Sequence, residues 1–581
     1  MTAGSVRSWI RRASSHRILT NGMPDRPGTE NRELFWPRCA AWGVIGLGWL
    51  IPLLLWISPG VTLPDGVGYF EYLPSAVLDG NLDFFDDWQK AGLITPDGVI
   101  LFAQPTRTGL LGTHWPCGSA TWWLPAFVLG HVSSLWHGSS DAHGFDQAHI
   151  VPPILASALA GLIVLVLSWT LARRVAGNSA AAAASLGVWF GSPLLFYSIR
   201  NSLTSHAVGA LACAACVGCA VAWRCDPVTS HRALAFGLAA GFAFAVRPQN
   251  APFALVPLFL FDAAQRRTAL RHVPLAALGA LAGSSPQLIV STFLYGSPWG
   301  FLAPTDGVAP FERVFALEPI LSWYHGMVPW TPVLGLAVAG FILLYRSDRG
   351  LGLAAVWCFA TEWAINATLD RSFWGGYAFG QRRFDNCTVF FVLGLAALIA
   401  WLPRWVGGGL VLACSAWTTS LVLAVPRFDL NRYQPPSVLL DAQLATLRDP
   451  ASWLRPLGGV PVGFRLGVLA WIIAMLACGG VAAWGFSRMS SVARLYAAAA
   501  WVVGSASIFL VAGLGSRRVA EQRAGIVSLN RSLGIPAGVV QCRLGLLQEE
   551  LHWLESTDRA AAAARTRAEI DGIERQRRER P

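Results

Sequence analysis

A segment that runs from 64 to 88, PDGVGYFEYLPSAVLDGNLDFFDDW, combines carboxylates with large aromatic residues. Pro59, Gly60 and Pro64 end the apolar stretch before it, so Asp65 is expected just beyond a helix end. A carboxylate held there has the chemistry of a base. The alternative is a solvated loop, which usually contains acids, and composition favours neither interpretation.

A second segment, DRSFWGGYAFGQRRFDN (370–386), places Arg382 next to Arg383. A planar guanidinium binds phosphate through two parallel hydrogen bonds. Gly375, Gly376 and Gly380 allow a close approach to the backbone. Anchoring of Arg and Trp among lipid headgroups is the alternative for this segment.

Polar residues also stand at the ends of other apolar segments. Arg247 is the strongest of them, because it closes an apolar helix where an ionisable group is costly unless it is used. The others are Arg200, Asn201, His206, Gln249, Asn250 and His325, with Glu362 inside its own segment. Each alone is more often a satisfied interfacial residue than a ligand. A carboxylate and arginines on one side of a membrane would together form a site for a lipid phosphate.

The composition requires a membrane. Hydrophobic residues make up 54% of the 581 residues and charged residues only 13%, whereas soluble domains have about 25% charged residues. The formal charge of +11 is therefore interpreted as topology, because Lys and Arg collect in cytoplasmic loops. No basic stretch is interleaved with aromatic residues, so we expect no nucleic-acid partner.

Charge sets the predicted sidedness. Residues 1–38 hold seven Arg and three acids and are predicted to be a cytoplasmic N-terminus. Residues 39–58 are apolar and long enough to span the bilayer. Residues 59–149 are predicted to form a long first extracytoplasmic loop, because nine acids face only Lys90 and Arg107 from 61 onwards.

The whole chain is predicted to be an all-α integral membrane protein with about 13 transmembrane helices, in a polytopic domain over 39–514. The apolar stretch 117–136 is predicted to be an interfacial amphipathic helix. Residues 515–581, with twelve Arg and nine acids, are predicted to be a charged helical tail outside. The remaining predicted spans are 150–171, 178–198, 205–223, 233–247, 250–261, 273–294, 328–345, 351–368, 387–402, 406–425, 465–486 and 493–514.

These motifs resemble a known superfamily. The pattern D-G-x-x-Y-F-x-Y-L-P-S-x-x-x-D-G-x-L-D-F from Asp65 resembles the first outer loop of GT-C glycosyltransferases. Over 39–425 the order and spacing are similar to those of bacterial members in the aminoarabinose transferase and protein O-mannosyltransferase group. The supporting segments are FYSIRNSLTSHAVG (196–209), GLAAGFAFAVRPQN (237–250), SWYHGMVPWTP (322–332) and FWGGYAFGQRRF (373–384).

The resemblance implies inverting transfer of a monosaccharide from a polyprenyl-phosphate donor to an envelope glycan, lipid or protein. The active site would face outward from the inner (plasma) membrane. Asp65 would be the general base toward the acceptor hydroxyl, and Arg382 and Arg383 would neutralise the leaving phosphate. The other expected substrate-binding residues are Tyr69, Glu71, His206 and Arg247.

Several alternatives stay open. HWPCGSATWW (114–123) stands where aminoarabinose transferases carry a Lys-Pro-Pro signature, which leaves the donor and acceptor classes open. No cofactor follows with certainty from the sequence, and the use of a metal stays open, with Asp86 and Asp87 as weak candidates to hold a divalent cation. A transporter or flippase of a lipid-linked saccharide is the main rival, and it would tolerate Asp65→Asn. An envelope polymerase or ligase would need a larger late outer loop than 426–464.

Overall fold

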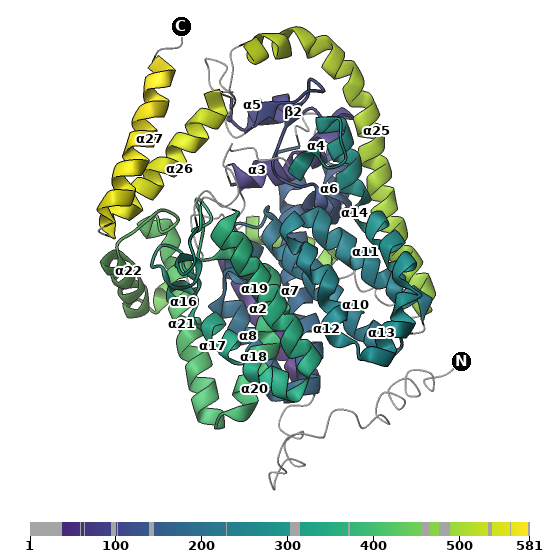
Figure 1. Ribbon diagram of the computed structural model, residues 1–581, viewed down its shortest axis with the longest axis vertical. Coiled ribbons are helices and arrows are strands. Elements are labelled where there is room, and N and C mark those ends of the chain that lie inside the picture. Colours follow the sequence, from purple (N-terminus) through teal and green to yellow (C-terminus); the bar gives the residue numbers. More distant parts are fainter. Residues whose placement is uncertain are drawn as a thin grey trace.

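Helices make up most of the computed structural model (Figure 1). The structure describes residues 38–578 except for gaps at 59, 63, 95–99, 101–102, 139–143, 228, 303–313, 370–371, 455–463, 476–488, 533–536 and 558. Residues 1–37 of the predicted cytoplasmic N-terminus lie outside the described part of the chain.

The first helix, α2 (Arg38–Trp56), leads into a segment of short elements. These elements fold back on the bundle instead of extending away from it, because their aromatic side chains are buried: Tyr72, Phe84 and Trp88 are almost fully covered. β1 pairs with β2 antiparallel, with Gln104 opposite Gly112. The elements are α3 (Asp65–Phe70), α4 (Tyr72–Pro74), the π-helix η2 (Ser75–Asp79), α5 (Phe85–Lys90), β1 (Gln104–Pro105) and β2 (Leu111–Gly112).

The next two helices form an antiparallel pair, α6 (Gly118–Trp136) and α7 (Gln147–Ala176). Trp123 Nε1 donates to Ser157 Oγ at 2.7 Å. The thirty residues of α7 extend about 45 Å, more than the roughly 30 Å of a hydrocarbon core. A helix is present as α6 where an interfacial amphipathic helix is expected at 117–136. It does not have one buried face and one exposed face, because residues all around its first half are buried.

The bundle is completed by further apolar helices, of which α8, α9, α10 and α20 pack against α7. They are α8 (Asn178–Gly191), α9 (Pro193–Ile199), α10 (Ser205–Cys225), α11 (Ser230–Val246), α14 (Val273–Tyr295), α19 (Arg349–Thr368), α20 (Thr388–Trp401), α21 (Arg404–Phe428) and α25 (Ser491–Ser532). Shorter elements connect them: the 3-10 helix η3 (Pro248–Leu255), α12 (Val256–Leu260), α13 (Ala263–Leu270), the 3-10 helix η4 (Gly300–Leu302), α15 (Glu318–Leu321), α16 (Met327–Trp330), α17 (Pro332–Ala339), α18 (Phe341–Ser347), the 3-10 helix η5 (Arg382–Cys387), α22 (Pro436–Arg448) and α23 (Ala451–Leu454).

The chain is an integral membrane protein, but the expected count of about 13 spans is not confirmed. Among the described residues, six helices are long and apolar enough to cross a membrane, and α8 with α9 gives a seventh if that pair, bent by 68°, is one span. Four further apolar helices are shorter: Ala40–Trp56, Ser230–Val246, Pro332–Ser347 and Phe464–Met475.

Proline explains where the predicted spans break. Proline lacks an N–H and clashes with the preceding turn. Pro193 therefore begins α9 after the bend, and Pro332 begins α17 after α16 has ended. The predicted span 250–261 is instead η3 followed by α12, a segment that holds Pro252 and Pro257.

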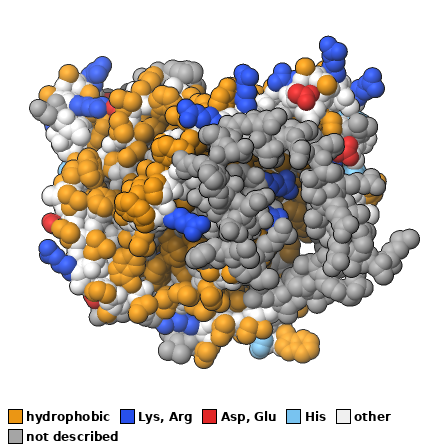
Figure 2. Space-filling view, turned by 90° about the horizontal axis from the view of Figure 1, so that it is seen from below, with side chains coloured by type: hydrophobic (Ala, Val, Ile, Leu, Met, Phe, Trp, Pro, Cys, Tyr) orange, Lys and Arg blue, Asp and Glu red, His pale blue; other side chains and the backbone are white. Residues whose placement is uncertain are grey.

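Three segments between apolar helices, at Arg224, Gln265 and Asp348, meet at one end of the bundle. The positive-inside rule predicts that short basic turns such as that of Arg224 are cytoplasmic. Arg224 Nη1 lies 2.7 Å from Asp348 Oδ2, and Gln265 Nε2 donates to the Arg224 carbonyl at 3.1 Å. Figure 2 views this end, where Lys and Arg side chains outnumber acidic ones among the coloured residues. α3, α4 and α5 lie at the opposite end (Figure 1).

A seam of glycines joins α11 to α14. A Cβ atom on Gly237 would lie 1.9 Å from the Ala276 oxygen, and one on Gly241 would lie 2.0 Å from the Ala280 oxygen. Gly279 and Gly283 meet the backbone of α11 equally closely from the other side. Small residues spaced four apart allow the two backbones to come this close. Van der Waals contacts between the backbones then stabilise the helix pair, because the hydrophobic effect does not drive helices together inside lipid.

We expect Gly241→Val to push α11 away from α14, because the new side chain would overlap backbone atoms that cannot rotate aside. The free energy of unfolding should fall by about 2–4 kcal/mol, seen as a lower thermal midpoint in detergent. Gly218→Ala is the matched control, since nothing lies within 4 Å of the added Cβ. Equal midpoints for the two variants would contradict the role of the seam.

The tail returns to the end that carries α3. The Leu82 amide donates to Ser516 Oγ of α25 at 2.6 Å, and the chain continues through α26 (Ala537–Ser556) and α27 (Ala560–Arg578). These two helices pack against each other (Figure 1). The described part of 515–581 is helical, in the end of α25, α26 and α27, and its separation from the membrane domain remains a prediction.

Candidate active site

Asp65 is the first residue of α3, directly after Pro64. The helix dipole favours an acid in the first turn. Its Oδ2 accepts a hydrogen bond from Arg382 Nη1 at 2.6 Å, and its Oδ1 accepts one from Trp115 Nε1 at 3.2 Å. The two charged side chains are 24% and 11% exposed, so the ion pair is largely desolvated and still open to a ligand.

The ionised state of Asp65 is favoured by its partners. Burial alone would raise its pKa, but the charge and hydrogen bond of Arg382, with smaller effects of His114 and Trp115, hold the pKa below the ordinary Asp value. Glu71 lacks such a partner, and burial raises its pKa well above the ordinary Glu value.

Three further residues predicted to bind substrate lie beside this pair. Tyr69 lies one turn along α3, and its hydroxyl accepts from Ser205 Oγ at 2.8 Å. His206 Nδ1 lies 3.0 Å from the Arg382 carbonyl oxygen. Arg247 Nη1 lies 3.4 Å from the same His206 nitrogen. The start of α10 and the end of α11 therefore lie beside the backbone of Arg382, and α3 contacts the start of α10 through Tyr69.

The Arg382 side chain still has a free donor. Its buried Nε has no hydrogen-bond partner among the described residues, although the guanidinium lies over the Tyr197 ring at 5.8 Å. Gly375 has φ +85°, and a Cβ atom there would lie 3.5 Å from that Nε. A buried unsatisfied donor is costly unless a ligand uses it.

Arg383 points elsewhere. Its Nη1 donates to the Ser372 carbonyl oxygen at 2.8 Å, so it holds the loop that precedes Arg382. Neighbouring residues of a 3-10 helix point about 120° apart, which explains why these two arginines separate. A direct role of Arg383 in phosphate binding remains a prediction.

Glu71 also faces away from the ion pair. It is fully buried and accepts a hydrogen bond from Trp88 Nε1, while the Trp88 ring lies 5.9 Å from the Trp115 ring. Glu71 therefore supports the tryptophan that contacts Asp65. Its expected place in the substrate cavity remains a prediction.

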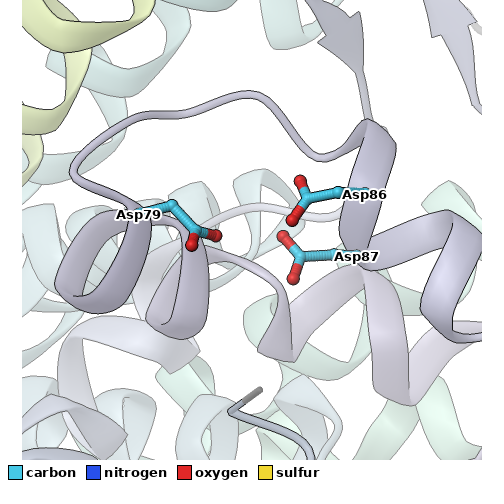
Figure 3. Close-up of side chains that lie close together, drawn as sticks. All are labelled: Asp79, Asp86 and Asp87. Atoms are coloured by element: carbon cyan, nitrogen blue, oxygen red, sulfur yellow. The ribbon is translucent and has the colours of Figure 1, made fainter. Parts of the chain in front are cut away.

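The candidate metal ligands Asp86 and Asp87 lie close to Asp79, with carboxylate oxygens of all three within 4.8 Å of one another (Figure 3). Lys90 Nζ lies 2.9 Å from Asp86 Oδ2 and 3.9 Å from Asp87 Oδ1. The ammonium already neutralises part of this group, and burial raises the pKa of Asp87 to about 8. A divalent cation would have to compete with both the ammonium and a proton, so the group is a poor fit for one.

The other polar residues at helix ends have structural partners. Asn201 Oδ1 accepts from Thr62 Oγ1 at 2.5 Å, and Arg200 Nη1 donates to the Trp56 carbonyl at 3.2 Å. Glu362 accepts from Gln249 and Asn386, each at 3.2 Å. Asn250 donates to the Ala243 carbonyl at 2.9 Å, and His325 packs on Trp330.

Sequence reasoning missed Trp115. This residue lies in the segment that departs from the Lys-Pro-Pro signature, and no motif marked it as a partner of Asp65. Its ring is pressed against α3, because a Cβ atom on Gly68 would lie 2.0 Å from Trp115 Cε3. His114 stacks on the same ring with centroids 3.7 Å apart. The unusual segment therefore borders the ion pair.

Gly68→Ala is expected to displace the Trp115 ring and break its hydrogen bond to Asp65. Loss of one hydrogen bond to a charged group corresponds to a roughly tenfold lower turnover, with normal amounts of protein in the membrane. Gly60→Ala lies in the same loop with nothing within 4 Å and should be neutral. Equal turnover of the two variants would remove Trp115 from the site.

The fold and the site define a polytopic membrane protein with a carboxylate–guanidinium pair at one end of its helix bundle. No protein-family model matches the chain, and no curated protein matches it. It is similar to two crystal structures of ArnT from Cupriavidus metallidurans. The apo structure shares 16% identity over 83% of this chain and 77% of ArnT, with a TM-score of 0.42. The structure bound to undecaprenyl phosphate shares 16% over 84% and 78%, with a TM-score of 0.41.

Proposed function

We propose that this protein transfers a monosaccharide from a polyprenyl-phosphate donor to a cell-envelope acceptor. The observation that carries the proposal is the 2.6 Å contact between Asp65 and Arg382. The contact supports the proposal because a carboxylate and a guanidinium share one partly open position. The free Nε of Arg382 and the adjacent Arg247 add donors for an anion.

The chemistry follows from the two charges. Asp65 accepts the proton of the acceptor hydroxyl while the hydroxyl oxygen attacks the anomeric carbon of the donor. The bond from that carbon to the lipid phosphate breaks on the opposite face, so the configuration inverts. The electron pair leaves with the phosphate oxygen, and Arg382 stabilises the developing negative charge.

The proposed location is the extracytoplasmic face of the inner membrane. The support is the separation of charge along the bundle, because α13, which holds Arg266 and Arg267, lies toward the end opposite to α3 (Figure 1). Basic turns remain in the cytoplasm, which would put Asp65 outside. The proposed partners are the polyprenyl-phosphate sugar, an envelope glycan, lipid or protein acceptor, and membrane lipids.

Transfer by the purified protein tests the proposal. The protein is placed in liposomes with polyprenyl-phosphate sugars that carry a radioactive label, and membranes from a deletion strain supply the acceptor. We expect label in an envelope component and release of the lipid phosphate. Movement of intact labelled donor across the bilayer, with no release of phosphate, would instead support the transporter or flippase.

A further inference from the structure

Two hydrogen bonds and one ion pair join the tail helices α26 and α27 to the segments that contain Glu318, Tyr324 and Trp374. Glu549 of α26 accepts a hydrogen bond from Trp374 Nε1 at 3.1 Å and from the Tyr324 hydroxyl at 3.3 Å, both at Oε2. The Trp374 and Tyr324 rings are stacked, with centroids 5.1 Å apart. Arg559 Nη1 forms a further ion pair with Glu318 at 2.9 Å.

Buried aromatic side chains pack around the same contacts. Trp553 lies one turn from Glu549 on α26, and its ring centroid is 4.8 Å from that of Phe373. Trp374 and Phe373 are fully buried, and Trp553 is nearly so. A cluster of this kind holds a loop rigidly, because several large rings lose their apolar contacts if the loop moves. The cluster consists of Phe315, Tyr324, Phe373, Trp374, Trp553, Leu554 and Ala563.

The loop that Glu549 holds also lies against the ion pair. Trp374 is followed directly by Gly375, and a Cβ atom added to Gly375 would lie 3.5 Å from Arg382 Nε, so the loop runs beside the Arg382 side chain. The Gln381 Nε2 donates to the Phe373 carbonyl at 2.5 Å, so the loop closes on the residue before Arg382. A displacement of Trp374 is therefore transmitted to the guanidinium through one intervening residue.

We propose that Glu549 is a positioning residue: through Trp374 it fixes the loop that holds Arg382 in place to bind phosphate. The tail helices α26 and α27 are then part of the active-site structure, although they follow the last span of the bundle. The phosphate ligand rests on the proposed function, whereas the positioning of the loop does not.

Two substitutions separate positioning from simple folding. Glu549→Ala removes both acceptor bonds, and Glu549→Gln keeps an amide oxygen that accepts from Trp374 and Tyr324. Glu555→Ala is the matched control, because Glu555 is an acid of the same helix that pairs with Arg567 of the neighbouring α27. Glu555 does not contact the outer loops among the described residues.

Hydrogen exchange of the full-length protein in liposomes gives a readout without activity. We expect faster exchange in 372–382 for Glu549→Ala, and wild-type exchange for Glu549→Gln and Glu555→Ala. Unchanged exchange in 372–382 of Glu549→Ala would overturn the inference. If exchange rises as expected while the wild-type protein transfers no sugar, the positioning of the loop stands and the proposed function falls.

Kinetics then test the route through Arg382. Glu549→Ala should lower kcat/KM for the donor about tenfold, since two hydrogen bonds that hold the loop are lost. The double variant with Arg382→Ala should be no slower than Arg382→Ala alone, because residues that act as one unit are not additive. Additive losses would show that Glu549 acts elsewhere and would overturn the inference.

Discussion

Asp65→Asn is expected to lower sugar transfer by about 10²–10⁴-fold, the usual contribution of a positioned base. The Asn side chain keeps nearly the same shape and can still accept from Trp115, but it cannot take the proton of the acceptor hydroxyl. Transfer of labelled sugar in liposomes measures the rate. Glycan analysis of a deletion strain that expresses the variant measures the consequence in the cell.

Asp441→Asn provides the comparison for this experiment. Asp441 is an exposed acid on α22, so the same change of charge should leave transfer unaltered. The amount of each variant in the membrane is measured beside its rate. Restoration of the normal glycan by Asp65→Asn at wild-type levels would rule out the base mechanism and would favour a transporter.

Arg382→Ala is expected to have the second large effect, because it removes two functions at once. The leaving phosphate loses its cation, which corresponds to about 10²–10³-fold in kcat. Asp65 loses the positive charge that counteracts the effect of burial on its pKa, so this pKa should rise above the ordinary Asp value. Turnover against pH measures both effects on one preparation.

The sign of the pH effect follows from these causes. In the wild-type protein the lowered pKa keeps Asp65 ionised, so activity is lost only as the pH falls through a value below the ordinary Asp value. In Arg382→Ala this loss should begin at higher pH, because burial then acts unopposed. Arg382→Lys keeps the positive charge and should keep the wild-type acid limb while it loses paired phosphate contacts.

An unchanged kcat and an unchanged acid limb in Arg382→Ala would remove this residue from the site. Arg383→Ala gives a useful comparison, because its guanidinium holds the Ser372 carbonyl instead of Asp65. It should leave the acid limb where it is in the wild-type protein. The two neighbouring arginines therefore have separable effects in one assay.

The sequence singled out both members of the ion pair because each carries a local signal. Asp65 follows a proline at a helix end, and Arg382 lies in a glycine-rich segment beside a second arginine. The helical class followed from apolar runs such as 150–171, which lies within α7. These signals are local, and each can be interpreted without knowledge of the partner.

The remaining features depend on contacts between distant segments. Nothing near Trp115 in the chain indicates that it will contact Asp65, and nothing local separates Arg382 from Arg383, which differ only in direction on η5. Glu549 lies in a charged tail, where acids are ordinary. The spans that break at Pro193 and Pro332 remained apolar in composition, so hydrophobicity alone joined pieces that proline separates.

The order of synthesis separates the two halves of the ion pair. Asp65 precedes Arg382 by 317 residues. The ribosome therefore synthesises the carboxylate long before the guanidinium that offsets the cost of burying its charge. Until η5 has been synthesised, this carboxylate is more stable in water than inside the nascent bundle. A chain that terminates before η5 therefore has no ion pair, and we expect it to lack the proposed activity altogether.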